Sequence, residues 1–361
     1  MNILKISIIL LFIIIISPSC LALSIKYVSH SPNYIDFNKN KEIAIKYTID
    51  ELAEVELKIY DDRDYLIKSI KPGLKPKVGE NIVKWNGTDN LNRAVPPEAY
   101  RYTITATTSH SQITHDLSDL TGGEYTRVRD IKWDTENNNI SYTLLKPARV
   151  NLRIGVDKNG PLLATISDWL SRDQGNHKLN WDGYDNSGVI KISTIDNYKI
   201  YPQAFTLSDN TILVGPYSEK IKLIENISWN NAKRKRVKIK KIKSKSHHQQ
   251  HNENRGDFIV EIKLPGNLLK DKNGVPIVSG IIPIRFSLNK KDKARVLNDR
   301  FEPILFLDGK YITENEVGFF PMTWKWDPKD VDEGEHYLSV NLRGYDGHYG
   351  AASIKVNVQH K

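Results

Sequence analysis

The sequence has one cysteine, two methionines and, after its first 22 residues, no apolar run of membrane length. One cysteine excludes a disulfide framework, a cysteine-rich zinc site and an iron–sulfur cluster. A helix that crosses a bilayer needs about 20 consecutive apolar residues. We therefore expect no transmembrane span in the mature chain, which would be soluble or peripherally attached.

Catalytic signatures are also missing. The sequence contains no Gly-x-Ser-x-Gly, no P-loop, no Gly-x-Gly-x-x-Gly after a strand and no His-Glu-x-x-His. These patterns position nucleophiles, phosphates, dinucleotides and zinc ions. None of the ten histidines lies in such a pattern. We predict a protein that is not an enzyme and needs no cofactor.

What the chain does contain favours strands and turns. It has 361 residues, of which 39 % are hydrophobic and 26 % are charged. That length suits two or three domains with buried cores, and the composition excludes disorder along the whole chain. The 17 Tyr, 7 Trp, 21 Gly and 16 Pro are typical of strands joined by tight turns.

The first 22 residues have the features of a secretory signal peptide. A basic start precedes the apolar residues 6–16, Pro18 ends the helix, and small residues allow cleavage after Ala22. The apolar stretch is too short to span a bilayer. The mature protein is therefore expected in the periplasm or outside the cell. Acylation of Cys20, which would make it a lipoprotein, is the alternative.

Three blocks of sequence occur twice, with an offset of 95 or 96 residues between the copies. The blocks are 45–49, 53–59 and 85–90, and their copies are 140–144, 148–154 and 181–186. An almost constant offset across three separate blocks indicates two tandem copies of one fold of about a hundred residues.

Within each copy, apolar and polar residues alternate, as in residues 43–49. A period of two is typical of strands with one buried face. Residues 257–361 show the same alternation, and residues 162–170 could form a short helical turn. We predict an all-β fold of three tandem immunoglobulin-like β-sandwiches after a cleaved signal peptide. The expected limits are signal peptide 1–22, sandwich 1 at 23–108, connection 109–126, sandwich 2 at 127–228, basic linker 229–256 and sandwich 3 at 257–361.

A Trp-Asx-Gly-x-Asp motif marks the end of a strand in both copies. Its residues are Trp85, Gly87, Asp89, Trp181, Asp182, Gly183, Asp185 and Gly188. With this motif, residues 31–214 resemble the immunoglobulin-like repeat of the flagellar hook-capping protein family, and the end of the chain resembles a bacterial immunoglobulin-like domain. The first copy departs from the pattern at Asn86 and at Asn92, and asparagine tolerates the left-handed backbone that glycine supplies.

The same motif has other interpretations. Asp182, Asp185 and Asn186 could suggest a calcium loop, but the bidentate glutamate of an EF-hand is missing. We therefore favour a hairpin turn, in which these side chains bond the local backbone. The motif tryptophans Trp85 and Trp181 are expected to be buried anchors rather than platforms for sugar stacking. Trp324 and Trp326, on one face of a strand, are also expected in the core, and the alternative is that they are exposed on the third domain and stack on sugars.

A basic segment precedes the third domain. Its nine basic residues account for the whole net charge of +9, so the remaining chain is neutral and no nucleic-acid partner is expected. The segment is either a solvated spacer that holds the third domain away from the second, or a strip that binds anionic lipid, acidic polysaccharide or an acidic protein. The candidates for polyanion binding are Lys233, Arg234, Lys235, Arg236, Lys238, Lys240, Lys241, Lys243 and Lys245.

Three histidines follow that segment. His247, His248 and His251 are weak candidates for zinc or copper ligands. Because a polar tract of this kind holds no fixed geometry, we do not predict a metal site.

These observations favour an exported, non-enzymatic scaffold, adaptor or assembly protein of the bacterial cell envelope, which binds envelope or secreted proteins through its sandwiches. The alternative is a module that binds carbohydrate or another envelope polymer with the third domain and the basic linker. The resemblance alone would suggest a hook-capping protein. That family leaves through the flagellar export apparatus, which conflicts with a signal peptide.

Overall fold

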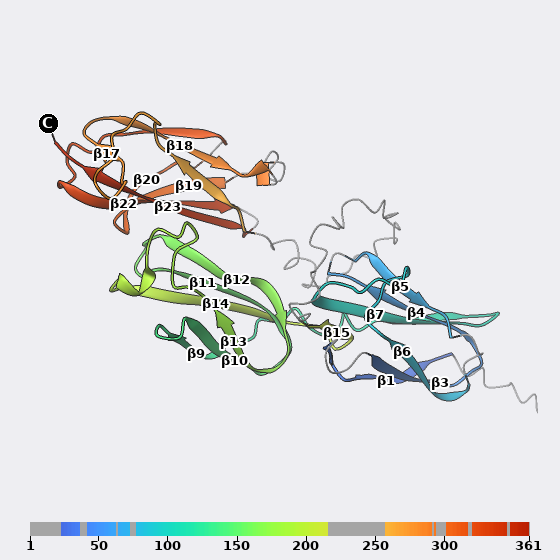
Figure 1. The fold of residues 1–361 in the computed structure, drawn as a ribbon. Coiled ribbons are helices and arrows are strands. Elements are labelled where there is room, and N and C mark those ends of the chain that lie inside the picture. The colour runs from blue at the N-terminus through green and yellow to red at the C-terminus, as the bar shows by residue number, and fades with distance from the viewer. Residues whose placement is uncertain are drawn as a thin grey trace, which may run out of the picture.

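The computed structural model describes residues 23–360 except 37–41, 63, 73–76, 216–256, 291, 294–300, 317–319 and 345–346. The described residues form three β-sandwiches, which we call units 1, 2 and 3 (Figure 1). Each unit packs a three-stranded sheet against a second sheet, so the predicted all-β fold is confirmed. Among the described residues, no helix is long and apolar enough to cross a membrane.

Unit 1 has a sheet of order β1-β3-β6 and a sheet of order β2-β15-β7-β4-β5, with β8 also on β7. The strands are β1 (Ile25–Ser31), β2 (Tyr34–Ile35), β3 (Ile43–Ile49), β4 (Glu54–Tyr60), β5 (Leu66–Ile70), β6 (Gly79–Trp85), β7 (Glu98–Thr107), β8 (Gln112–His115) and β15 (Thr211–Val214). The alternation predicted for β3 is confirmed, because its odd-numbered residues are buried between the sheets.

Unit 2 has two sheets of three strands, with orders β9-β10-β13 and β12-β11-β14. The elements are β9 (Arg129–Asp134), β10 (Asn139–Leu144), β11 (Ala148–Val156), β12 (Leu162–Arg172), β13 (Gly175–Asn180), the 3-10 turn η1 (Ile192–Thr194) and β14 (Tyr198–Thr206). The helical turn suggested for residues 162–170 is wrong. These residues belong to β12, which pairs with β11 across several bulges.

Unit 3 repeats the arrangement of unit 1, with sheets β16-β18-β21 and β17-β23-β22-β19-β20. The strands are β16 (Val260–Lys263), β17 (Ile277–Val278), β18 (Ile282–Leu288), β19 (Phe301–Leu307), β20 (Lys310–Glu314), β21 (Met322–Trp326), β22 (Gly334–Gly344) and β23 (Tyr349–Val358).

The register of the strands follows the duplicated sequence. In unit 1, Val55 of β4 lies opposite Ala106 of β7. In unit 2, Val150 of β11 lies opposite Ala204 of β14. Tyr198 of β14 therefore corresponds to Tyr100 of β7. The two copies share their strand order in every strand that both possess.

The units differ in the closing strand, which we define as the strand beside β7, β14 or β22 on the side away from β4, β11 or β19. In unit 3 it is the continuous β23. In unit 1 it is split, because β8 pairs with residues 104–107 of β7 and β15 pairs with residues 98–101. In unit 2, among the described residues, only residues 123–126 bond β14 on this side, near its end.

This arrangement corrects the domain limits expected from the sequence. Residues 211–214 were assigned to sandwich 2, yet they complete unit 1 as β15 (Figure 1). The chain leaves unit 1 after β8, forms unit 2 and returns to unit 1. Unit 2 is thus inserted within the closing strand of unit 1.

Candidate binding surfaces

The Trp-Asx-Gly-x-Asp motif forms the same turn in units 1 and 2. The indole N–H donates to the carbonyl oxygen three residues later, at 2.9 Å from Trp85 and at 3.1 Å from Trp181. Gly183 has a φ of +83°, a left-handed conformation that favours glycine. Asn92 has a φ of +58° where the second copy has Gly188 at +68°. The predicted tolerance of asparagine at this position is confirmed.

The motif aspartates hold the rest of each turn. The Oδ1 atoms of Asp89 and Asp185 each accept two backbone N–H groups at 2.7 to 2.9 Å. In addition, Asp182 accepts the N–H of Tyr184 at 3.0 Å. Oxygens that a calcium loop would direct at a cation thus bond the local backbone, which is the geometry of a hairpin turn.

The second oxygen of each aspartate distinguishes the two copies. Oδ2 of Asp89 accepts Nε of Arg93 at 2.8 Å and lies 2.7 Å from its Nη2. Burial raises the pKa of Asp89, but the bonds from Arg93 and the backbone outweigh it and lower that pKa. In unit 2 the place of Arg93 is taken by Val189, and Oδ2 of Asp185 is buried with no hydrogen-bond partner.

The outer side of β14 is an open sheet edge. The N–H of Thr206 donates to Glu124 and that of Thr126 donates to Ala204, so the even-numbered residues of β14 direct their backbone groups outward. By this alternation the N–H of Ile200 points outward. Among the described residues, no strand pairs with β14 there. We call the stretch 198–203 the open edge.

Proline shapes the open edge. Pro202 lies opposite Leu152 of β11, and the alternation places its backbone nitrogen on the outer side. Proline removes a ladder donor and is therefore confined to sheet edges. In unit 1 the corresponding residue is Ile104, which pairs with His115 of β8. The sequence of β14 thus suits a sheet edge, in keeping with the lack of a neighbouring strand among the described residues.

A buried seam joins the two parts of the closing strand in unit 1. The side-chain amide of Asn210 donates to the carbonyl oxygen of Tyr102 at 2.7 Å and to Asp116 at 2.9 Å. The backbone N–H of Tyr102 donates to the carbonyl of Asn210 at 3.0 Å. Arg101 forms ion pairs with Asp116 and with Asp64. This seam holds β15 in place although unit 2 separates it from β8.

A buried ion pair also links unit 1 to unit 2. Arg149 of β11 lies 2.9 Å from Glu98 of β7, and only 4 % and 10 % of their side chains are exposed. The same guanidinium donates to the carbonyl of Trp169 at 3.2 Å. Removing one partner of such a pair costs about 3–5 kcal/mol, because the other charge is left buried. Units 1 and 2 are therefore firmly connected.

Unit 3 is attached to unit 2 through Asp257. Its carboxylate accepts two bonds from Arg153 of β11, at 2.7 and 3.1 Å, and one from the hydroxyl of Thr165 at 2.6 Å. It also accepts the N–H of Tyr349 at 3.0 Å, and the guanidinium of Arg153 lies 4.5 Å from the centre of the Tyr349 ring. Both side chains of the Arg153–Asp257 pair are 90 % buried.

A second contact at this junction covers the edge of β12. The amide of Asn341 donates to the carbonyl of Leu162 at 2.7 Å and accepts the N–H of the same residue at 2.7 Å. The hydroxyl of Ser187 accepts the N–H of Ser353 at 2.8 Å. The third domain is thus not held away from the second, and that part of the spacer interpretation is wrong (Figure 1).

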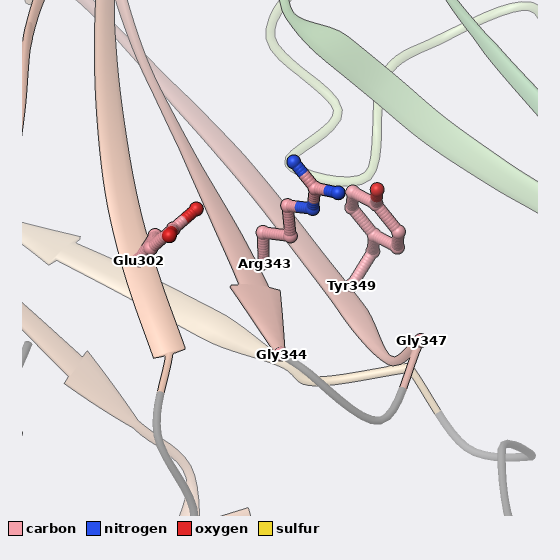
Figure 2. Close-up of a pocket in the computed structure, with 5 residues that line it drawn as sticks. All are labelled: Glu302, Arg343, Gly344, Gly347 and Tyr349. Atoms are coloured by element: carbon pink, nitrogen blue, oxygen red, sulfur yellow. The ribbon is translucent and has the colours of Figure 1, made fainter. Parts of the chain in front are cut away.

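A small hollow lies on unit 3 beside this junction. It is lined by Glu302, Arg343, Gly344, Gly347 and Tyr349 and has a volume of about 230 Å³. Glu302 and Arg343 lie opposite each other on β19 and β22, and Tyr349 begins β23 opposite Arg343 (Figure 2). The volume is below the 300–1,000 Å³ or so that is usual for ligand pockets.

Several predicted sites lie outside the described residues. These are the signal peptide with Cys20, the nine basic residues 233–245, and the three histidines 247, 248 and 251. Trp326 is buried in the core of unit 3, and Trp324 packs against the same core. Trp326 is therefore not available to the aromatic surface that the carbohydrate alternative expected on the third domain, whereas Trp324 is half-buried.

The open edge and the residues at both junctions were missed by sequence reasoning. Asp257 and Asn341 carry no motif. The one available signal was Pro202, which occupies the position in β14 that Ile104 occupies in β7.

Comparison with known protein families finds a match to part of the first unit. Residues 32–110 match the family model of the FlgD Ig-like domain. This bears out the resemblance to the hook-capping repeat for unit 1. No match was found among curated protein sequences.

Several solved structures match the chain at low sequence identity and low TM-score. The fibronectin(III)-like modules of Clostridium thermocellum CbhA are 12 % identical, with 89 % of this chain and 86 % of that chain covered and a TM-score of 0.20. A bacterial ice-binding adhesin is 13 % identical, with 94 % and 99 % covered and a TM-score of 0.19. At such TM-scores we derive the fold from the strand pairing alone.

Proposed function

We propose that this chain is an exported, non-enzymatic scaffold or adaptor of the bacterial cell envelope, and that it binds a partner protein at the open edge of β14. The observation that carries the proposal is that, within the described part of the chain, no strand closes unit 2 beside β14, whereas units 1 and 3 each have a closing strand. The match to an FlgD Ig-like domain and the immunoglobulin-like fold fit an exported protein.

Strand addition is the binding mode that this edge supports. An exposed edge offers backbone donors and acceptors to an extended segment of another protein, and side chains then supply specificity. By the alternation of β14, Ile200 offers one outward N–H, while Ile200 and Pro202 both offer outward carbonyls. Tyr198 and Tyr201 are each 38 % exposed, so aromatic surface borders the edge. The partner segment would run antiparallel to β14, in line with residues 124–126.

The fixed junctions favour a scaffold role. Buried ion pairs at Arg149 and Arg153 join unit 2 to both neighbours. Because unit 3 covers the edge at β12, the two edges of this sheet differ: one is occupied within the chain, and the other faces outward. A partner bound at β14 would be held at a set position relative to units 1 and 3.

Photo-crosslinking in the native host tests the proposal. A benzoylphenylalanine at Lys199 of the full-length protein should crosslink to a partner. The variant Ile200→Pro removes one outward N–H and should abolish this crosslink, whereas Ile200→Val keeps that N–H and should preserve it. A crosslink that persists in Ile200→Pro, or one that is absent from the parent protein, would contradict the proposal.

A further inference from the structure

Trp181 and Trp85 occupy the same place in the turn but differ in exposure. In unit 1, Trp85 is 1 % exposed, and the fully buried Ile43 lies opposite it on β3. In unit 2, Asn138 takes the position opposite Trp181, since its carbonyl accepts the N–H of Trp181 at 2.9 Å. Asn138 is exposed and has a φ of +51°. Exchange of a buried isoleucine for an exposed asparagine uncovers the indole of Trp181, which is half-buried.

The uncovered indole lines a shallow, open hollow with a volume of about 600 Å³. The remaining lining residues are Asn137, Asn138, Asn180 and Asp182. Among the described residues, the side-chain amides of Asn138 and Asn180 form no hydrogen bond, so both amides are available to a ligand. Each amide can both donate and accept. The hollow thus combines one aromatic surface with the neutral amides of three asparagines and the carboxylate of Asp182, and it has no basic residue in its lining.

The aromatic part of the hollow is fixed in place. The indole N–H of Trp181 is bonded within the turn. Its ring lies 4.8 Å from that of Trp133, and Trp133 in turn contacts the ring of Tyr198 at 5.0 Å. A Cβ on Gly183 would lie 3.3 Å from the Trp133 ring, so the turn packs closely on this cluster. A ligand would meet a preorganised surface, which lowers the entropic cost of binding.

We propose that this hollow, at the tip of unit 2, binds a neutral oligosaccharide. A pyranose ring has an apolar C–H face that can cover an indole, and its neighbouring hydroxyls both donate and accept hydrogen bonds. Trp181 would take the ring face, and the amides of Asn138 and Asn180 would bond the hydroxyls. The absence of lysine and arginine from the lining argues for a neutral rather than an acidic sugar. The lining of the hollow contains no residue of the open edge, although Trp133 contacts both Trp181 and Tyr198, and the site goes beyond the proposed adaptor function.

Calorimetry with the full-length mature protein tests the site. The probes are hexamers of α-1,4-linked glucose, β-1,4-linked glucose and β-1,4-linked N-acetylglucosamine. At least one should bind with a Kd on the order of 0.1–1 mM. Asn138→Gly keeps the positive φ, and Asn180→Ala alters an exposed side chain, so neither disturbs the core. Each should weaken binding about two- to tenfold, the usual worth of one hydrogen bond, and together they should weaken it further.

The matched control is Lys84→Ala, because Lys84 of unit 1 lies opposite Ala44 as Asn180 lies opposite Asn139. This control should leave binding unchanged. The proposal is overturned if none of the three hexamers binds, or if the double variant binds as well as the parent while thermal unfolding shows it to be folded. Failure here would leave the crosslinking result at β14 unaffected, so the two proposals fail separately.

Discussion

Units 1 and 2 share a sequence motif, a strand order and a register, yet of the two only unit 1 has a closing strand among the residues that the structure describes. The segment that follows β14 passes to unit 1 and becomes β15. Completing one sandwich in this way leaves the other with an open edge. The comparison shows that two copies of a repeated sequence need not form the same set of strands, because one copy can obtain a strand from a distant part of the chain.

The largest effect on the stability of a single unit is expected at β15. Ile212 is fully buried in the core of unit 1. Ile212→Ala should destabilise unit 1 by about 2–5 kcal/mol, the cost of truncating a buried aliphatic side chain. Urea unfolding of the full chain, followed by hydrogen exchange of the core amides of β7, measures this. Ile259→Ala, at an exposed position, is the control. Loss of stability in unit 2 alone would show that β15 does not belong to unit 1.

A second prediction concerns the junction between units 2 and 3. Trypsin should cut first within residues 233–256, as their basic composition suggests, but units 2 and 3 should stay together on gel filtration. Asp257→Ala leaves Arg153 buried without its partner, at a cost of about 3–5 kcal/mol. Separation of the cut fragments in this variant is the expected result. Asp330→Ala, at an exposed ion pair, should leave them joined. Co-elution of the Asp257→Ala fragments would show that the junction does not depend on this pair.

The response to pH should differ between units 1 and 3. Burial lowers the pKa of His30, an effect that the carbonyl of Thr211 only partly offsets. The unfolded chain then takes up a proton below about pH 6.5 that folded unit 1 does not, so unit 1 loses stability as the pH falls. Burial also acts on His336, but its bonds to Asp308 and to the carbonyl of Asp332 outweigh burial and raise the pKa of His336. Unit 3 therefore gains stability that is fully present below about pH 6.5 and is lost as the pH rises through the folded pKa.

Urea unfolding is measured between about pH 5.5 and pH 8, the range in which histidines titrate. Pulsed hydrogen exchange at one labelling pH then reports the stability of unit 1 and of unit 3 separately. The slopes of stability against pH should have opposite signs. His30→Gln should flatten the slope of unit 1 alone, and His336→Gln that of unit 3 alone. Equal slopes of stability against pH in both units would contradict the opposite pKa shifts of His30 and His336.

The smallest effect concerns the motif turns. Val189→Arg would give Asp185 the partner that Arg93 provides for Asp89. Because Arg93 is about half exposed, such a pair is worth about 0–1 kcal/mol, and part of the packing of Val189 would be lost. We expect a change in the stability of unit 2 of less than about 1 kcal/mol, measured by thermal unfolding. A loss of several kcal/mol would show that the copies of the turn are not equivalent.

More of the fold than of the binding surfaces could be predicted from the sequence. Alternation in residues 43–49 and the motif at Trp85 and Trp181 are local signals, and they predicted strands, turns and duplication correctly. Strand exchange is not local. Residues 211–214 have the same pattern whether they pair with β14 or with β7, so their assignment to sandwich 2 was wrong. The uncovering of Trp181 depends on which residue lies opposite it, and pairing across strands was not visible in the motif.

The openness of the β14 edge is the central claim, and the exchange of one backbone amide tests it most directly. Hydrogen exchange of the free full-length protein, resolved by residue, compares Ile200 of β14 with the corresponding Tyr102 of β7. The N–H of Tyr102 is bonded to Asn210 and should be strongly protected. The N–H of Ile200 should exchange at a rate near that of an unstructured amide. Equal and strong protection of both amides would show that the edge is already occupied, and would contradict the account.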